Sequence, residues 1–380
     1  MLAKKTSLPS ALYVHIPFCA RKCNYCDFNS SVSDSNIIDL YLAAIDKDMC
    51  LLQGKYIFHT IFVGGGTPTL LTETQLEKLL SGIAHSIQTD TVQEYTIEAN
   101  PGTLTMSKAR LLKDYSVNRV SLGVQSFQDN FLSFLGRIHS RDDAIHAFTV
   151  LRTAGFENIN LDLMFGCSKQ SLDSWKKDLV TATELNPEHL STYALTYEEE
   201  TNLMNALKSG IIKKLNESIE LDMYKASIEY LSKKGFTHYE ISNFAKPRYE
   251  CKHNKIYWKN LSYVGIGAGA YSFIHGIRSS NEKDILTYIK RSQENKNLQV
   301  FCERLENDCL ASETIVMSLR LRSGISNTDF TARFGYTLED RYGVLINKLT
   351  HEGFVCYDRK TLSLTKKGLF LADSVLAEFI

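Results

Sequence analysis

The chain has 380 residues, of which 44% are hydrophobic and 23% are charged; this is the composition of a folded globular protein, not of a disordered or collagen-like chain. Its 43 basic and 43 acidic residues cancel, so no global charge draws it toward nucleic acid or an anionic membrane surface. No apolar run approaches the ~20 residues of a membrane span. His15 and Pro17 interrupt the apolar run near the N-terminus, which predicts no signal peptide. We expect a cytoplasmic protein without stable membrane insertion.

The first half of the chain alternates short β-branched runs with longer segments of helical periodicity, which is typical of repeated βα units. Six strands are expected, at 11–16, 60–65, 95–99, 120–125, 159–165 and 190–196. Helices are expected at 36–53, 72–87, 105–115, 141–154, 172–185 and 219–234. Strands that are apolar on both faces indicate a parallel sheet covered by helices. Six such units predict an α/β fold with an open, partial (β/α)6 barrel instead of the closed eightfold one.

The pattern changes after about residue 240. We expect residues 1–240 to form the partial barrel, 241–300 a connecting segment and 301–380 a small C-terminal domain. The connecting segment starts with a loop-like stretch and continues with VGIGAGAYSF, whose small residues allow close backbone approach. The C-terminal part has three helical patterns and a hairpin, which resembles a winged helix. Glu339 and Asp340 begin the helix that would read nucleic acid, so we expect no nucleic-acid partner.

Three of the nine cysteines lie within one short stretch, YVHIPFCARKCNYCDF, as Cys19, Cys23 and Cys26. Three thiolates on one loop can bind one metal centre. A structural zinc site normally takes four ligands, and no second C-x2-C follows downstream. On a four-iron cluster, three cysteines would leave one iron open to a ligand. Zinc completed by His15 or a remote residue, and three ordinary core cysteines, are the alternatives.

The C-x3-C-x2-C spacing after the first strand of a βα array resembles the signature of the radical S-adenosylmethionine (SAM) superfamily. The resemblance implies a [4Fe-4S] cluster on Cys19, Cys23 and Cys26, and SAM chelated to the open iron. It also implies an electron donor for the cluster. The fold of that superfamily is the partial (β/α)6 barrel that the strand pattern predicts.

The sequence YVHIPFC resembles the corresponding motif of the branch that contains oxygen-independent coproporphyrinogen III oxidase and the HemW-type heme chaperones. By this resemblance Tyr13 lies over the SAM site and Tyr25 packs near the adenine. The motifs GGGTPT, EANP, SLGVQSF, LGR and NLDLMFG supply the other implied SAM-binding residues, which are Gly65, Gly66, Thr67, Glu98, Gln125, Arg137 and Asp162. Taken singly, each of these residues has an ordinary structural explanation, such as a tight turn for the glycines.

The segment YEISNFAKPRYECKHNKIYW resembles the H-N-x-x-Y-W segment of the HemW-type proteins. The resemblance implies heme as a further cofactor, with His253 as its axial ligand, and an acceptor hemoprotein as partner. Imidazole is a common axial ligand of heme iron, and aromatic side chains such as Tyr257 and Trp258 can pack a flat macrocycle. A surface or hydrogen-bonding histidine is the alternative.

Phe28 stands where the oxidase has a further cysteine, and only 18 residues precede Cys19. Both departures favour a heme chaperone over coproporphyrinogen oxidation. Two alternatives stay open at this point. The first is an oxidase or another radical SAM enzyme that acts on a tetrapyrrole, and the second is a zinc-stabilised module that binds nucleic acid.

Overall fold

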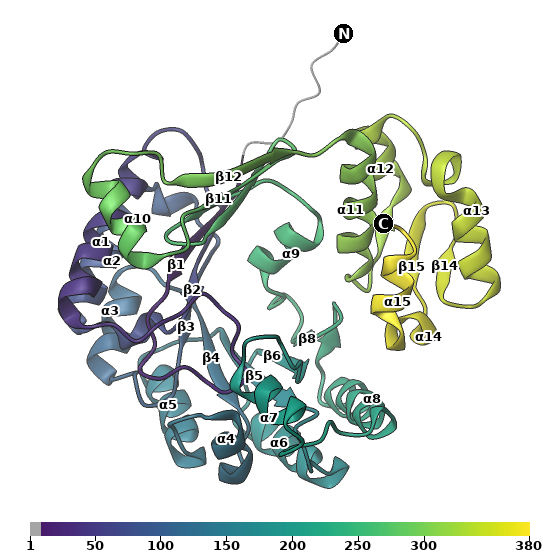
Figure 1. The fold of residues 1–380 in the computed structure, drawn as a ribbon. Coiled ribbons are helices and arrows are strands. Elements are labelled where there is room, and N and C mark those ends of the chain that lie inside the picture. The colour runs from purple at the N-terminus through teal and green to yellow at the C-terminus, as the bar shows by residue number, and fades with distance from the viewer. Residues whose placement is uncertain (1–8) are drawn as a thin grey trace.

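The computed structural model describes residues 9–380. Residues 1–8 lie outside the described range, and so does that part of the N-terminal region in which the sequence predicts no signal peptide. A 12-stranded sheet curves through the larger part of the molecule, and a three-stranded sheet belongs to a separate C-terminal unit (Figure 1).

Six parallel strands follow one another in chain order through the middle of the large sheet. They are β1 (Ala11–Ile16), β2 (Thr60–Gly65), β3 (Glu94–Ala99), β4 (Arg119–Gln125), β5 (Ile159–Phe165) and β6 (His189–Ala194). The six expected strands are all present, which confirms the predicted partial (β/α)6 barrel. Because the strands are parallel, their carboxyl ends lie along one rim of the barrel, where such sheets bind ligands.

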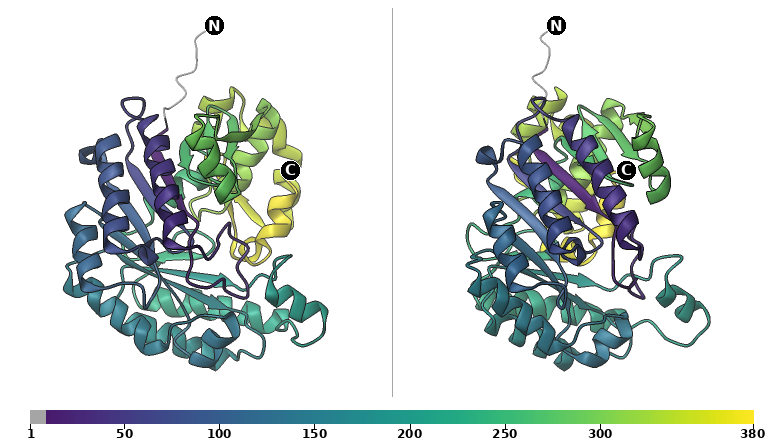
Figure 2. Two further views of the ribbon diagram at one scale, coloured as in Figure 1. Left: turned by 60° about the vertical axis from the view of Figure 1, so that its left-hand side comes forward. Right: turned by 90° about the vertical axis from the view of Figure 1, so that its left-hand side faces the viewer.

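Helices cover the outer face of these strands (Figure 2). The six expected ones are α1 (Ser35–Cys50), α2 (Glu73–Ser86), α3 (Met106–Asp114), α5 (Arg141–Thr153), α6 (Leu172–Glu184) and α8 (Glu217–Lys233). Capping boxes at Thr72, Ser140 and Ser171 fix the starts of three of them, because the reciprocal bonds satisfy free N–H groups of the first turn. Two short helices, α4 (Asp129–Leu135) and α7 (Asn202–Lys208), were not expected from the pattern.

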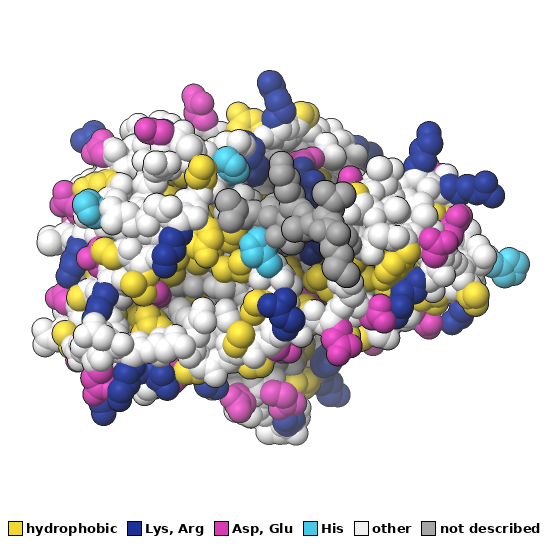
Figure 3. Space-filling model, turned by 90° about the horizontal axis from the view of Figure 1, so that it is seen from above, with side chains coloured by type: hydrophobic (Ala, Val, Ile, Leu, Met, Phe, Trp, Pro, Cys, Tyr) yellow, Lys and Arg dark blue, Asp and Glu magenta, His cyan; other side chains and the backbone are white. Residues whose placement is uncertain are grey.

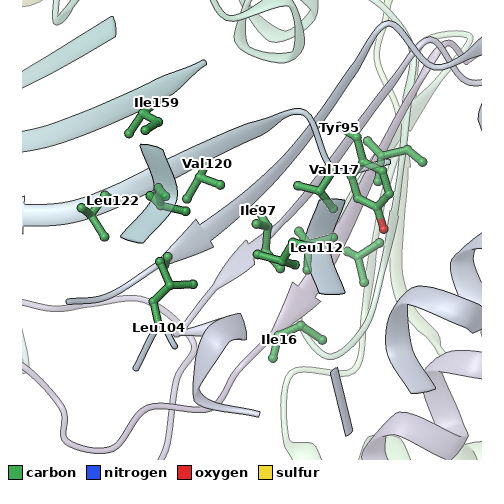
Figure 4. Close-up of a cluster of buried hydrophobic side chains, with 14 of the residues drawn as sticks. Ile16, Tyr95, Ile97, Leu104, Leu112, Val117, Val120, Leu122 and Ile159 are labelled. Atoms are coloured by element: carbon green, nitrogen blue, oxygen red, sulfur yellow. The ribbon is translucent and has the colours of Figure 1, made fainter. Parts of the chain in front are cut away.

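Apolar side chains between the strands and the helices form the main core (Figure 4). Ile97 and Leu122 from neighbouring strands are fully buried, and so is Leu112 from α3. Full burial of such a side chain contributes about 1.5–3 kcal/mol. This packing holds β1 to β5 in place, and with them the loops at the strand ends.

Residues 237–304, which include the expected connecting segment 241–300, extend the large sheet at both of its ends. On one side, β8 (Asn243–Ala245) pairs antiparallel with β6, and β7 (Thr237–His238) forms the edge. On the other side, β9 (Tyr263–Ile266) pairs parallel with β1. The strands β10 (Tyr271–Ile274), β11 (Ile277–Asn281) and β12 (Gln299–Arg304) follow, with α10 (Ile285–Gln293) between the last two. The stretch that reads as a loop in the sequence contains the helix α9 (Lys252–Trp258).

The C-terminal unit has its own hydrophobic core. Its elements are α11 (Asn307–Leu319), β13 (Ile325–Ser326), α12 (Asn327–Phe334), α13 (Leu338–His351), β14 (Val355–Tyr357), β15 (Thr361–Leu364), α14 (Lys366–Phe370) and α15 (Ala372–Ala377). The strands are arranged in the order β13-β15-β14. Three helices followed by a hairpin confirm the predicted winged-helix-like arrangement.

Acidic and basic side chains are interspersed over the face seen from above (Figure 3), in keeping with the balanced charge of the chain. Among residues 9–380, no helix combines the length and the apolar character that a membrane span requires.

Candidate functional site

The three clustered cysteines lie on the loop that follows β1. Hydrogen bonds close this loop, from Cys19 N to Ser31 O (3.0 Å) and from Ser31 N to Pro17 O (2.8 Å). Burial raises the pKa of the Cys19 and Cys26 thiols, and the nearby Cys23 thiol raises both pKa values further. The three sulfur atoms therefore lie close enough to influence one another electrostatically.

Within the described part of the chain, no group of three or more His, Cys, Asp or Glu side chains is arranged to hold a single metal ion. An iron–sulfur cluster makes a different demand on the protein, because its thiolate ligands bind separate irons and need not meet at one point. Three free, half-buried thiols on one loop fit that demand in ligand type and number.

A turn after β9 packs against the cysteine loop. Asn29 Nδ2 donates to the carbonyl oxygens of Ala268 (3.1 Å) and Lys283 (3.0 Å), and the Asn29 carbonyl oxygen lies 2.8 Å from His15 Nε2. A Cβ atom on Gly267 would lie 2.7 Å from the carbonyl oxygen of His15. The small residues of VGIGAGA thus permit the close backbone approach that the sequence predicts.

The glycines of GGGTPT pack directly against this loop. Gly65 has φ +114°, and a Cβ atom there would lie 2.4 Å from the His15 ring. A Cβ atom on Gly66 would lie 2.6 Å from the carbonyl oxygen of Phe18, which also accepts a hydrogen bond from Thr67 N (2.7 Å). Contacts within the protein therefore account for both glycines, since only glycine leaves room for so close an approach.

Arg137 connects the cysteine loop to the ends of two strands. Its Nη1 donates to Cys23 Sγ (3.5 Å), and its Nη2 donates to Gly123 O (2.6 Å) and to Asn100 Oδ1 (2.5 Å). Asn100 in turn donates through Nδ2 to Thr67 Oγ1 (2.6 Å). A fixed guanidinium thus lies beside one cysteine, a contact that the sequence does not reveal. Asn100 is a site residue that sequence reasoning missed, although it belongs to the quoted motif EANP.

Tyr25 and Gln125, two of the predicted SAM-binding residues, lie next to the network of contacts around Arg137. Tyr25 lies between two of the cysteines in sequence and beside Arg137 in space, and burial raises its pKa. Gln125 ends β4 with φ +67°, at the point where the register of β4 against β5 shifts. A left-handed residue at a strand end changes the direction of the chain, so the next segment leaves the rim there.

Two carboxyl groups, of Glu98 on β3 and Asp162 on β5, lie close enough to influence each other electrostatically. Glu98 Oε2 accepts a hydrogen bond from Gly65 N (2.9 Å), and burial raises the pKa of Glu98 to about 7. Asp162 accepts from Ser121 Oγ (3.0 Å) and Asn160 Nδ2 (2.8 Å), and burial raises its pKa as well. The Asp162 charge contributes to the raised pKa of Glu98, whereas the charge of the buried Arg119 lowers the pKa of both acids. The two acids therefore already have a cationic partner within the protein.

Tyr13 belongs to a row of aromatic side chains that starts beside the cysteine loop. Its hydroxyl lies 2.9 Å from His15 Nδ1, and its ring centroid lies 6.2 Å from that of Phe62. The Phe62 ring lies 5.2 Å from the ring of His253. The residue implied for heme and a residue implied for SAM are therefore separated by a single phenyl ring.

His253 lies in the first turn of α9, which packs against β2 on the inner side of the curved sheet (Figure 1). The buried carboxylate of Glu94 accepts hydrogen bonds from Lys252 N (2.8 Å) and His253 N (2.9 Å), which fixes the start of the helix. The His253 ring is completely buried. Its Nδ1 lies 2.9 Å from Thr60 Oγ1, and its Nε2 lies 2.9 Å from the hydroxyl of Tyr257.

Burial and, to a smaller extent, the Arg119 charge lower the pKa of His253 to about 3. The imidazole is therefore neutral at physiological pH, which is the form that binds metals. In this conformation, however, both ring nitrogens have protein partners.

Comparison with known families agrees with the two-part architecture. The family model of the radical SAM superfamily matches residues 13–181, and that of the HemN C-terminal domain matches residues 305–371. These ranges cover the cysteine loop with β1 to β5, and most of the C-terminal unit.

Curated proteins resemble the chain over nearly its whole length. The heme chaperone HemW of Lactococcus lactis is 36% identical over 98% of this chain and 97% of its own length. That of Escherichia coli is 33% identical over 98% of both chains. The chain belongs to the HemW family of heme chaperones. HemW of Bacillus subtilis is also 36% identical, over 97% of this chain and 98% of its own length.

The fold of this HemW-family chain also resembles a solved structure. Coproporphyrinogen III oxidase (HemN) from Escherichia coli, described as a radical SAM enzyme, superposes with a TM-score of 0.86 at 24% identity. The alignment covers 99% of this chain and 91% of that chain. The similarity extends through the barrel and the C-terminal unit, and at this identity it concerns the fold alone.

Proposed function

We propose that this HemW-family chain binds a [4Fe-4S] cluster and SAM at the rim of the barrel, and carries heme to an acceptor hemoprotein. The observation that carries the proposal is the packing of the cysteine loop against the turn after β2: Thr67 Oγ1 lies 3.8 Å from Cys19 Sγ, and Gly65 N donates to the carboxyl group of Glu98 (2.9 Å). Soft thiolates suit iron and sulfide, and a carboxylate suits a sulfonium cation.

Each element of the cluster site has a defined role in this proposal. Cys19, Cys23 and Cys26 would each bind one iron and leave the fourth open. When bound, the cluster supplies an electron to SAM, and an electron donor must replenish it. Arg137 would place positive charge beside Cys23, and its bonds to Asn100 and Gly123 hold it there.

We propose that the SAM residues lie around this loop. Glu98 and Asp162 would accept hydrogen bonds from hydroxyl or ammonium groups, and Tyr13 and Tyr25 would pack against the nucleoside. The remaining proposed contacts are Gly65, Gly66, Thr67, Gln125 and Arg137. Most of these residues lie at or just after the carboxyl ends of β1 to β4, which supports a single site, whereas Tyr13 and Asp162 lie within β1 and β5.

For heme, we propose His253 as the axial ligand. The neutral state of the imidazole supports this role. Because the ring is fully buried and both of its nitrogens are hydrogen-bonded, neighbouring groups would have to move before heme iron could reach it. The flat aromatic surroundings, with Phe62 and Tyr257 at ring distances of 5.2 and 5.0 Å, suit a macrocycle.

The deciding experiment is anaerobic reconstitution of the cluster, followed by heme titration and transfer of bound heme to an apo-hemoprotein. Coproporphyrinogen turnover is assayed on the same sample, because the fold similarity to HemN favours an oxidase as the second candidate. Saturable heme binding and transfer without turnover is the expected result. Turnover without heme binding would favour the oxidase function over the chaperone function, even though Phe28 stands where the oxidase has a further cysteine.

A further inference from the structure

Asn24 lies in the turn between the second and third cysteines of the loop, and it joins this turn to two short helices. Its N–H donates to Leu135 O (2.9 Å) and its Nδ2 donates to Phe134 O (3.0 Å), both at the end of α4. Its carbonyl oxygen accepts from Leu203 N (2.9 Å), near the start of α7. The turn is therefore held from two sides.

The two helices are anchored unequally. α4 buries the apolar side chains of Phe131, Leu132 and Leu135, whereas Leu203 is the only buried residue of α7. Apolar burial is the main favourable contribution to packing, and elements with few buried apolar contacts open locally at a lower free energy than the core. Of the two supports of the turn, α7 should therefore open first.

We call residues 198–212, which contain α7, the clasp. Among the residues that the structure describes, every hydrogen bond that leaves the clasp ends on Asn24, at its carbonyl oxygen and, from Asn202 Nδ2, at its Oδ1 (3.5 Å). Besides these bonds, Leu203 and the partly buried Ile212 provide its apolar contacts. The clasp thus has few attachments to the barrel.

Leu203 enters a small hydrophobic cluster at the rim of the barrel. Leu135, Met164 and Cys167 are among its buried members, and Tyr25 of the cysteine loop packs against it. Cys167 is completely buried. When Leu203 leaves this cluster, Tyr25 loses part of its packing and Cys167 loses part of its cover.

We propose that the clasp opens while the barrel stays folded, and that its opening frees the turn from Cys23 to Cys26 and uncovers Cys167. In the closed state Asn24 fixes the turn, so it is a positioning residue for the cysteine loop. The opening breaks the bond from Leu203 N to Asn24 O and no strand pairing. In the open state metal ions and other reagents reach the thiols. This inference goes beyond the proposed function and requires no bound cofactor.

Four substitutions separate the clasp from the rest of the fold. Leu203→Ala removes the main anchor of the clasp, whereas Leu203→Met conserves the volume of the side chain and should behave like the unaltered chain. Asn24→Ala removes the side-chain bond to Phe134 O and leaves Leu203 in place. Asn205→Ala changes an exposed residue of the same helix; it is the matched control and should leave all rates unchanged.

The experiment is a timed reaction of the full chain, reduced and freed of metal by a chelator, with N-ethylmaleimide. Peptide mass spectrometry follows each cysteine separately. Leu203→Ala should make Cys23, Cys26 and Cys167 react roughly tenfold faster, because the loss of a buried leucine raises the population of the open clasp. Asn24→Ala should speed the reaction of Cys23 and Cys26 about threefold, the effect of one net hydrogen bond, and leave Cys167 unchanged.

Two further readouts guard against general unfolding. Cys251 is buried at the start of α9, with its Sγ 3.5 Å from Glu94 Oε1 on β3, and it should stay unreactive in all four variants. In the unaltered chain, backbone hydrogen exchange should be faster in residues 198–212 than in α4, a comparison that needs no substitution.

Equal labelling rates in Leu203→Ala and the unaltered chain would overturn the clasp, and so would equal exchange protection of residues 198–212 and α4. Labelling of Cys251 together with Cys167 would overturn it too, because the barrel would then open as a whole. Reconstitution of the cluster tests the proposed function separately, since the labelling uses the metal-free chain.

Discussion

The guanidinium Nη1 of Arg137 lies 3.5 Å from Cys23 Sγ, and its Nη2 is held by Gly123 O and Asn100 Oδ1. A cation fixed beside a thiolate ligand favours the more negative, reduced state of an iron–sulfur cluster. Net charge and hydrogen bonds to sulfur are two of the features that set cluster potentials.

Replacement of Arg137 by Gln should therefore lower the reduction potential of the reconstituted cluster, on the order of 50 mV, which is slightly less than a tenfold change in a one-electron equilibrium. Arg137→Lys, which keeps the charge, should lower it less. A potentiometric titration followed by electron paramagnetic resonance measures both shifts. Equal potentials in Arg137→Gln and the unaltered protein would remove the arginine from this role.

Each cysteine of the loop should be required for cluster assembly. Cys19→Ala, Cys23→Ala or Cys26→Ala should lose most of the iron and acid-labile sulfide, with an unchanged circular dichroism spectrum, because the loop lies outside the hydrophobic core. Cys302→Ala, which changes an exposed cysteine on β12, is the matched control and should keep full iron content. A loop variant with full iron and sulfide would exclude that cysteine as a ligand.

Gly65 should tolerate no side chain. Its φ of +114° is unfavourable for alanine, and the added Cβ would lie 2.4 Å from a His15 ring that is fixed by Tyr13 and Asn29. Gly65→Ala should lower the free energy of unfolding by about 3 kcal/mol. Gly102→Ala, with φ +83° and no atom within 4 Å of its Cβ, should lose about 1 kcal/mol. Denaturant titrations of both variants check this, and equal losses would contradict the predicted contact.

Glu240 should make the stability of the protein depend on pH. This carboxyl group is fully buried, and burial raises its pKa from 4.5 to about 7. Between these two values the folded chain keeps the proton that the unfolded chain has lost, so the free energy of unfolding falls as the pH rises. The contribution of Glu240 amounts to a loss on the order of 3 kcal/mol above pH 7.

Glu240→Gln carries no titrating group at this position, and its stability should change less between pH 5 and pH 8. Denaturant titrations at the two pH values provide the measurement. Identical pH dependence in Glu240→Gln and the unaltered protein would show that the Glu240 carboxyl does not titrate in this range.

The fold of the first half could be read from the sequence because each strand and helix there has its own periodic pattern. α9 could not, because KHNKIYW is short and its start depends on the carboxylate of Glu94, far away in the chain. β9 and β11 were missed since Gly265, Ser279 and Ser280 are poor strand formers. Pairing of β9 with β1 compensates for that weak propensity.

The position of Cys19, Cys23 and Cys26 on one loop was predictable for a related reason: their spacing is local. The partners that fix the surrounding side chains come from distant segments. Asn100 contacts Arg137, 37 residues away along the chain, and Thr60 contacts His253, 193 residues away. Such contacts depend on the order of strands in the sheet, which a single sequence does not specify.

The bonds from Asn29 to the carbonyl oxygens of Ala268 and Lys283 join residues separated by 239 and 254 positions along the chain. During synthesis the cysteine loop leaves the ribosome among the first segments, whereas these partners follow much later. Until β9 has been made and has paired with β1, the loop lacks its final support and its thiols are open to the surroundings. The order of translation thus creates an interval in which the three thiols of the proposed cluster site are accessible, before the turn after β9 packs against the loop.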